Sequence, residues 1–380
     1  MKVAYISKRD HSDISQWSGT VHYMDRSLVG SGLHLNYVSG YRSAWELVFL
    51  AKTALYRKVL KRPYARHYQP AVLRSYARQI EGTLDQIKPD VIFTPDATSI
   101  AYLQTDIPIV FWTDSTFAGV QGFYHQLTNL SAADIRRANL VEQQAISNCC
   151  LAIYCSAWAA QTALDNYNVD PSKVKVVPFG ANIDCNRTVV DIKQIISNRD
   201  TAVCKLLFVG VDWLRKGGDI AVAVATALNA NGLPTELHVV GCTPPSPTPH
   251  FVKLHGFVSK QSHDGRMLLN NLFTQSHFFI LPTRAECFGV VFAEASSFGL
   301  PSLATRVGGV PTAVIDNMNG KTFAIDGIVE YMTDYILETI ADNVTYNDLC
   351  MRSFTEYCNR LNWVTVGNTV NQLIHELDPR

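Results

Sequence analysis

The sequence has no net charge, no long apolar run and few charged residues of either sign. Its 33 basic residues balance 33 acidic ones, and charged residues make up 17% of the chain, against about 25% in an average soluble domain. No global field attracts nucleic acid, so an anionic partner has to be held locally. No stretch approaches the ~20 apolar residues of a membrane span, and the first residues lack the apolar core of a signal peptide. We expect a cytoplasmic protein, soluble or peripheral on the inner face of a membrane.

The cysteines lack the spacing of a zinc site or a disulfide framework. There are nine of them, an odd number, with no Cys-x2-Cys pair, and most fall inside apolar runs such as 149–155. Buried reduced thiols explain this pattern better than metal ligands or disulfides, and they fit a reducing compartment. The sequence also lacks a Gly-x-Gly-x-x-Gly fingerprint after a strand, which argues against a dinucleotide-dependent dehydrogenase.

The length and the alternation of apolar runs predict two α/β domains. At 380 residues the chain is too long for one typical core, and short apolar strands alternate with helical patterns in both halves. We predict a first domain over 1–180, a polar linker with the hinge over 181–203, and a second domain over 204–362. Each domain should hold a Rossmann-like parallel sheet.

The stretch 277–301 combines a buried strand, a turn and a helix that carry two acids. Glu286 falls in the turn and Glu294 follows eight residues later, about 80° around the helix, so the two do not form one adjacent acid–base pair. Either glutamate alone would read as a solvated surface charge. The first-turn amides between them are suited to a phosphate; they belong to Phe288, Gly289, Val290 and Val291.

A second loop carries the positive charge that a diphosphate needs. It follows the strand that ends at Gly210 and contains Arg215 and Lys216 before two glycines. A cation placed there favours the transition state in which charge grows on a leaving phosphate. The alternative is a pair of exposed loop bases.

The order of these motifs resembles the retaining glycosyltransferases of family 4, which have the GT-B fold. The resemblance covers most of 176–325 and rests on Glu286-x7-Glu294 with its Phe-Gly core, the following Gly299-Leu-Pro301, and the loop at 210–219. It implies two domains facing a cleft, with the final helix, in 363–380, returning to the first domain.

The resemblance also assigns roles on the donor side. It implies that Glu286 contacts the donor sugar, Glu294 the nucleotide ribose, and Lys216 the phosphates. The family often has an arginine directly after the strand's glycine, where this chain has Val211; Arg215 would compensate. The nucleobase would lie beside Val258. Gly19, in a glycine-bearing loop after the first strand, would face the donor phosphates, and Gly210 would be a further donor contact.

Acceptor contacts are predicted from the strand ends of the first domain. Asp96 and Asp114 each follow an apolar strand on the crevice side, although an aspartate there also serves as a helix N-cap or turn residue. The family often has a histidine near Asp114, which this chain lacks; His125 is a substitute, although a lone histidine is more often structural.

The implied activity is transfer of a sugar from a nucleoside diphosphate sugar to an acceptor hydroxyl with retention of configuration, in polysaccharide or glycolipid synthesis. UDP is the commonest nucleotide in the family. No Asp-x-Asp pair is present to chelate Mg²⁺ or Mn²⁺, so we expect no metal and no cofactor, the nucleotide sugar being a substrate. Alternatives are a nucleotide-sugar epimerase on the same fold and a non-catalytic sugar-binding module.

One segment of the first domain is basic and apolar. From Trp45 to Pro63 apolar residues recur at helical spacing, and six bases fall between Lys52 and Arg66. An ordinary solvated helix face is one interpretation. The other is a surface for anionic lipid or an anionic, lipid-linked acceptor, which would make the protein a peripheral membrane protein.

Overall fold

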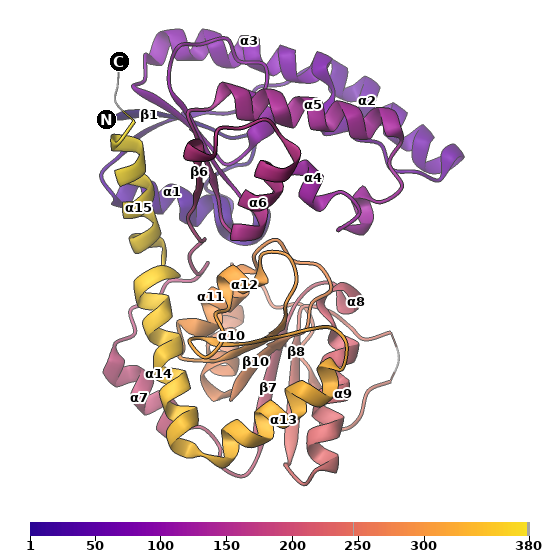
Figure 1. Cartoon of the computed structure of the whole chain (residues 1–380), viewed down its shortest axis with the longest axis vertical. Coiled ribbons are helices and arrows are strands. Elements are labelled where there is room, and N and C mark those ends of the chain that lie inside the picture. Colours follow the sequence, from indigo (N-terminus) through magenta and orange to yellow (C-terminus); the bar gives the residue numbers. More distant parts are fainter. Residues whose placement is uncertain (246, 378–380) are drawn as a thin grey trace. The chain divides into compact units, whose positions relative to one another are not determined.

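The computed structural model describes residues 1–245 and 247–377 and divides into two compact units (Figure 1). The first consists of Met1–Pro178 with Val366–Arg380, and the second of Phe179–Thr365. The chain therefore passes between the units twice. Each unit is built on one six-stranded parallel sheet, as the strand and helix patterns predicted.

The sheet of the first unit has the strand order β2-β1-β3-β4-β5-β6, and every pairing is parallel. The β3, β4 and β5 strands are almost wholly buried, as expected of strands covered by helices on both faces. The strands are β1 (Lys2–Ile6), β2 (His34–Val38), β3 (Val91–Thr94), β4 (Ile109–Thr113), β5 (Leu151–Tyr154) and β6 (Val174–Val176).

Helices follow these strands as crossovers. The longest, α3, has proline at its first position, where a missing N–H costs nothing, and buries an apolar stripe that includes Tyr76 and Ile80. The helices are α1 (Thr20–Gly30), α2 (Trp45–Leu55), α3 (Pro70–Ile87), α4 (Phe117–Val120), α5 (Ala132–Asn148) and α6 (Ala157–Asn166).

The last helix, α15 (Trp363–His375), completes the first unit. The side-chain amide of Asn371 donates to the backbone oxygen of Ser31 at 2.7 Å, and Gly367 lies so close to Ser27 that a Cβ would sit 2.1 Å from its hydroxyl oxygen. The predicted return of the C-terminal helix to the first domain is confirmed.

The sheet of the second unit has the order β12-β11-β10-β7-β8-β9, again all parallel. The central position of β7 and β10 places the loops after these two strands next to each other at the carboxyl edge. The strands are β7 (Cys204–Val209), β8 (Thr235–Val240), β9 (Val252–Leu254), β10 (Phe278–Leu281), β11 (Ser302–Thr305) and β12 (Gly320–Phe323).

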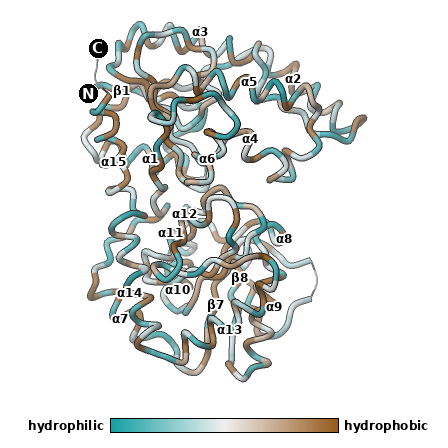
Figure 2. The backbone as a smooth tube through the Cα atoms, viewed as in Figure 1, coloured by the Kyte–Doolittle hydropathy of each residue, from teal (hydrophilic) through white to brown (hydrophobic). Residues whose placement is uncertain are grey.

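The helices of the second unit cover this sheet, and Figure 2 shows hydrophobic residues concentrated along the strands beneath them. Among the described residues, no helix of either unit is long and apolar enough to cross a membrane. The helices are α7 (Val189–Ser197), α8 (Trp213–Lys216), α9 (Gly218–Ala230), α10 (His263–Gln275), α11 (Val290–Ser296), α12 (Val310–Ala313), α13 (Ile328–Ala341) and α14 (Asn343–Arg360).

The segment 181–203, which we predicted as a linker, differs from that prediction. It forms α7, which packs against α14 and buries Ile192 completely. After it, the buried guanidinium of Arg199 donates to the hydroxyl of Tyr346 at 2.8 Å and to the carbonyl of Gly299 at 3.2 Å. The segment belongs to the second unit because a few buried side chains fix it there. Its mostly polar composition gave no sign of these buried contacts.

A buried acid lies in the core of the first unit. Glu142 on α5 is 4% exposed, and its Oε1 has no hydrogen-bond partner within the described part of the chain. Burial, with a smaller contribution from the charge of Asp96, raises the pKa of Glu142 to about 8 from its ordinary 4.5. The folded protein therefore keeps this carboxyl protonated at neutral pH.

We predict that Glu142→Gln makes the protein less sensitive to alkaline pH. An unfolded chain releases this proton at a pKa of about 4.5 and the folded chain near 8, so the wild-type free energy of unfolding falls as pH rises through that window. The amide mimics the neutral acid, so the variant should gain on the wild type by a few kcal/mol between pH 5 and 8. Thermal melts across this range, with the exposed Asp85→Asn as control, would measure the gain; parallel pH curves for wild type and variant would contradict it.

Candidate active site

The loops after β7 and β10 bring a lysine and a glutamate together at the carboxyl edge of the second sheet. Lys216, at the end of α8, donates from Nζ to Oε2 of Glu286, which lies in the turn after β10. Arg215 Nη1 is 3.9 Å from the same oxygen and donates to the carbonyl of Ala285 at 3.0 Å. The two cations thus lie beside a carboxylate that follows them by about 70 residues in the sequence.

The turn after β10 holds α8 in place through its backbone and Arg284. The amide of Arg284 donates to the carbonyl of Arg215 at 2.7 Å, and its guanidinium binds the two carboxylate oxygens of Asp219 at 2.8 and 2.7 Å. At Gly217, φ is +79° and a Cβ would lie 2.0 Å from the carbonyl oxygen of Pro282. Only glycine permits this approach, so the backbone itself fixes where Lys216 points.

Glu286 is 8% exposed and is held from its other side as well. Its backbone oxygen accepts from the amide of Gly309, in the loop after β11, at 3.0 Å. Gly289 has φ of +82°, and a Cβ there would lie 2.6 Å from the ring of Phe292 and 3.3 Å from Cγ of Glu286. Helix α11 starts directly afterwards at Val290, so the structure brings the amides of Phe288–Val291 beside this carboxylate.

Glu294 is more deeply buried than Glu286, at 1% exposure. Its Oε1 accepts from Nζ of Lys260, and it also accepts from the backbone amide of Asn182. Burial raises the pKa of Glu294, while Lys260 and the amide oppose that rise. Because both glutamates are buried and paired with lysines, the interpretation of them as solvated surface charges is wrong, and so is that of Lys216 as an exposed loop base.

The ends of β7, β8 and β9 form one continuous backbone platform. The amide of Gly210 donates to the carbonyl of Val240 at 2.9 Å, and the amide of Gly241 donates to that of Gly256 at 2.8 Å. A Cβ on Gly241 would lie 2.6 Å from the Gly210 carbonyl oxygen. Val258 follows on this platform, half-buried, and its contact with a nucleobase stays a prediction.

The predicted residues of the first unit lie in the loops after its own strands. Gly19 caps α1 with φ of +90°, following Trp17 and Ser18, whose φ values of 48° and 57° are also left-handed. A Cβ on Gly19 would lie 3.2 Å from the side chain of Ile14, and the positive φ would strain any other residue, so this turn favours glycine. Its contact with donor phosphates stays a prediction.

The two aspartates of the first unit have local partners. Asp96 accepts from the amide of Thr98 at 3.0 Å and from the hydroxyl of Ser99 at 3.1 Å, which confirms the N-cap alternative for this residue. Asp114 accepts from the hydroxyl of Ser115 at 3.0 Å. His125 is exposed. Acceptor binding by any of the three stays a prediction.

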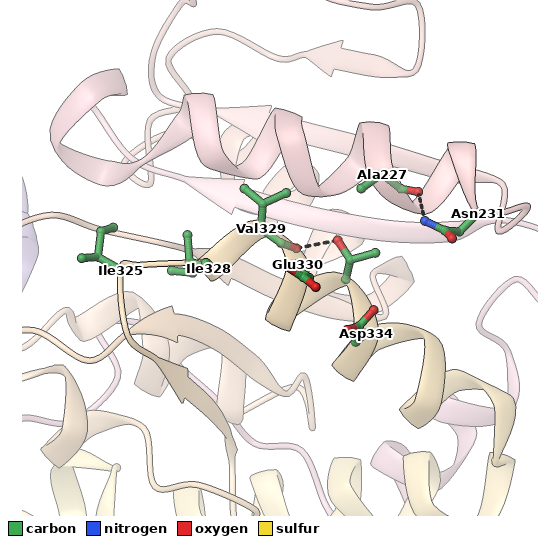
Figure 3. A pocket seen from close by; sticks show the side chains of 9 residues that line it. Ala227, Asn231, Ile325, Ile328, Val329, Glu330 and Asp334 are labelled. Carbon is green, nitrogen blue, oxygen red and sulfur yellow. Dashed lines mark hydrogen bonds between the residues drawn. The ribbon is translucent and has the colours of Figure 1, made fainter.

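A separate pocket lies between α9 and α13 of the second unit (Figure 3). Ala227 and Asn231 line it from α9, and Val329, Glu330 and Asp334 line it from α13. None of the residues predicted from the sequence belongs to it.

Family models match both halves of the chain. A model described as "Glycosyltransferase Family 4" matches residues 23–184, and one described as "Glycosyl transferases group 1" matches residues 204–342. The chain is a family 4-like GT-B glycosyltransferase.

Curated relatives and solved structures agree with this assignment. D-inositol 3-phosphate glycosyltransferases are 25% identical over 285 residues in Corynebacterium glutamicum (strain R) and 23% over 283 in Corynebacterium diphtheriae, covering 71% and 70% of this chain. The chain spans only 67% and 65% of these relatives. The lipopolysaccharide outer core galactosyltransferase WaaB has a TM-score of 0.66 at 13% identity, and Anabaena HepE in complex with UDP-glucose one of 0.62 at 16%; each covers 99% of this chain and 100% of that structure.

Three site residues of this glycosyltransferase escaped the sequence reasoning. Arg284 and Asp219 lie in stretches that we had singled out, but nothing in their spacing shows that they bind each other across 65 residues. Lys260 lies two residues after Val258, in the loop that follows β9. A lysine close to a predicted nucleobase contact was the available signal for it.

We predict that Lys260→Met destabilises the second unit by leaving Glu294 buried without its cation. Breaking a buried pair in this way costs about 3 kcal/mol, which should appear as a lower melting temperature at pH 8. The loss should shrink at pH 5, because the pKa of Glu294 is already raised and protonation removes the unpaired charge.

A control variant and a compensating double variant test this explanation. Lys253→Met removes a lysine whose pair with Glu236, at 3.5 Å, is largely exposed and should cost little. Adding Glu294→Gln to Lys260→Met should recover most of the lost stability. Equal losses for Lys253→Met and Lys260→Met, or no recovery in the double variant, would show that the buried pair is not responsible.

Proposed function

We propose that this glycosyltransferase moves a hexose-type residue from a UDP-sugar to an acceptor hydroxyl with retention of anomeric configuration. The observation that carries the proposal is the cluster of Arg215, Lys216 and Glu286 at the carboxyl edge of the second sheet. Ligands of open parallel sheets bind at that edge. The crystal structures of HepE in complex with UDP-glucose and with UDP support a uridine nucleotide as the donor group.

In the proposed mechanism, the cations neutralise the leaving diphosphate. In the structure, Lys216 is paired with Glu286. A bound diphosphate would compete with that carboxylate for Lys216 and Arg215, and the charge they meet grows as the bond from the anomeric carbon to the phosphate oxygen breaks. Glu286, once released, would accept from a hydroxyl of the donor sugar. The proposal invokes no metal ion and no resident cofactor.

Retention follows if both bond changes occur on one face of the sugar. The acceptor oxygen forms the new bond to the anomeric carbon on the face from which the diphosphate departs, and the departing phosphate oxygen takes the acceptor proton. No carboxylate needs to act as a nucleophile, which suits a site where Glu286 and Glu294 are each paired with a lysine.

Glu294 is proposed to accept from the ribose hydroxyls of the nucleotide. Its carboxylate is preorganised by the Asn182 amide and by Lys260, so that a ribose hydroxyl would replace or join partners already in place. The apolar rim at Val258 would then cover the base. The amides of Gly289, Val290 and Val291 would lie on the diphosphate or sugar.

The acceptor is proposed to be a saccharide or a lipid-linked molecule used in polysaccharide or glycolipid synthesis, with Asp96 and Asp114 of the first unit on its side. WaaB acts on the lipopolysaccharide outer core, and the curated relatives on D-inositol 3-phosphate, according to their names.

Incubating a labelled UDP-sugar with and without acceptor separates transfer from epimerisation. Label in a new glycoside supports sugar transfer. Conversion of the UDP-sugar into another UDP-sugar without acceptor would instead indicate an epimerase.

We predict that Lys216→Ala lowers kcat by about 10²-fold or more, because a preorganised charge at the leaving group is lost. Because Lys216 is paired with the buried Glu286, the variant should also lose some stability, so kcat is compared at a temperature at which circular dichroism shows the variant to be folded. Lys193→Ala, an exposed lysine on α7 of the same unit, is the matched control and should retain full activity. A folded Lys216→Ala enzyme with unchanged kcat/KM would refute the role.

The two glutamates should separate in kinetics. Glu294→Gln is expected to weaken UDP binding by about 1–3 kcal/mol, measured by calorimetric titration, because a buried acceptor of ribose hydroxyls is impaired. Glu286→Gln is expected to lower kcat without weakening UDP binding, since its proposed partner is the sugar that moves during reaction and the amide competes less with the diphosphate for Lys216. Identical small changes in KM for both variants would count against this division of roles.

A further inference from the structure

Helix α2 differs from the other long helices because it has no buried residue. Its apolar side chains are open to solvent, and this continues through the π-helical turn Tyr56–Leu60. We refer to residues 45–62 as the α2 arm. Its large exposed apolar side chains, with their exposed fractions, are Trp45 52%, Leu47 74%, Val48 53%, Leu50 49%, Leu55 58%, Val59 63% and Leu60 53%.

One side of the arm is fixed to the first unit, so the opposite side has a defined orientation. Glu46 accepts from the hydroxyl of Tyr76 at 2.6 Å, and the rings of Phe49 and Tyr56 lie 6.3 and 4.8 Å from that of Tyr64. Positions 46, 49 and 56 share one helical face, which places Leu47, Val48 and Leu55 on the outer face. Figure 1 shows α2 at one end of the first unit.

The arm is also basic, in a chain with no net charge. Between 45 and 66 the only acid is Glu46, which is already engaged by Tyr76 and by Lys8 at 3.1 Å. Lys52 Nζ lies over the rings of Tyr56 and Tyr64, 5.7 and 5.0 Å from their centroids. The bases of this segment are Lys52, Arg57, Lys58, Lys61, Arg62 and Arg66.

An apolar helix face bordered by bases matches the interface of an anionic lipid bilayer. Apolar side chains enter the boundary between headgroups and acyl chains, and lysines and arginines reach the phosphates. A second copy of this chain fits less well, because a two-fold contact places the same patch against itself and would oppose five bases with five. We propose that the α2 arm docks the protein on anionic membranes, a property that goes beyond the proposed function.

Vesicle co-sedimentation of the full chain, without donor or acceptor, tests this proposal. Vesicles of phosphatidylcholine with phosphatidylglycerol should bind the protein at low salt, and vesicles of phosphatidylcholine alone should bind it far more weakly. Raising the salt from 0.05 to 0.5 M should weaken binding by about tenfold or more, because the headgroup charges are screened. Absence of binding to the anionic vesicles at low salt would overturn the proposal.

Double variants separate the contribution of the basic side chains to membrane binding from that of the apolar side chains. Arg57→Gln with Lys58→Gln should weaken binding by about twenty-five-fold, at about fivefold for each base near an anionic leaflet. Leu47→Ser with Leu55→Ser should weaken it by a similar factor and leave the salt dependence in place. The controls are Arg136→Gln with Lys193→Gln and Val344→Ser with Val364→Ser, exposed residues of matched type on other helices.

The controls decide what a loss of binding means. Wild-type binding by both control pairs, with loss in both arm pairs, supports the arm as the docking surface. Equal losses in control and arm variants would overturn it. A dimer seen by analytical ultracentrifugation and abolished by Leu47→Ser with Leu55→Ser would also overturn it, since the arm would then join two copies. UDP binding, measured in the same variants, should be unchanged and keeps this test independent of the proposed catalysis.

Discussion

The contact between Gly217 and the carbonyl of Pro282 is the constraint on which the carboxyl edge of the second unit's sheet depends. Because no Cβ fits there, the loop after β7 can lie directly on the turn after β10. Arg284 then binds Asp219 and the carbonyl of Leu214 across the same contact. The close approach of the two loops therefore allows Lys216 and Glu286, 70 residues apart in the sequence, to form an ion pair.

The same edge of the sheet contains two buried carboxylates, and each is paired with a lysine. Glu286 binds Lys216 and Glu294 binds Lys260, so neither carboxylate is left as an unpaired buried charge. On the proposed function, a donor would have to take the lysines from these carboxylates in order to bind. That exchange would reduce affinity for the ground state, while the growing charge on a leaving phosphate would still gain from the cations.

Much of this organisation was predictable, and the remainder had physical reasons to stay hidden. Parallel strands with acids and glycines after them give the fold and place Lys216, Glu286 and Glu294 at one edge. The partner of Glu294 was not predictable, because Lys260 arrives from a different strand and no spacing rule connects the two. The linker prediction over 181–203 failed to see α7, since one buried residue such as Ile192 is enough to dock a polar helix. The exposure of α2 was equally hidden, because helical spacing shows that a stripe exists but not which side is covered.

The double passage of the chain between its units has a consequence for biosynthesis. The second unit, Phe179–Thr365, is continuous and is synthesised in full before the end of the chain appears. The first unit lacks its last helix until residues after Val366 leave the ribosome, so the surface around Ser27 on α1 and Ser31 directly after it stays uncovered during that time. Domains generally fold as units as they emerge, and this order is inverted here. The half of the chain that is made first is the half that is completed last.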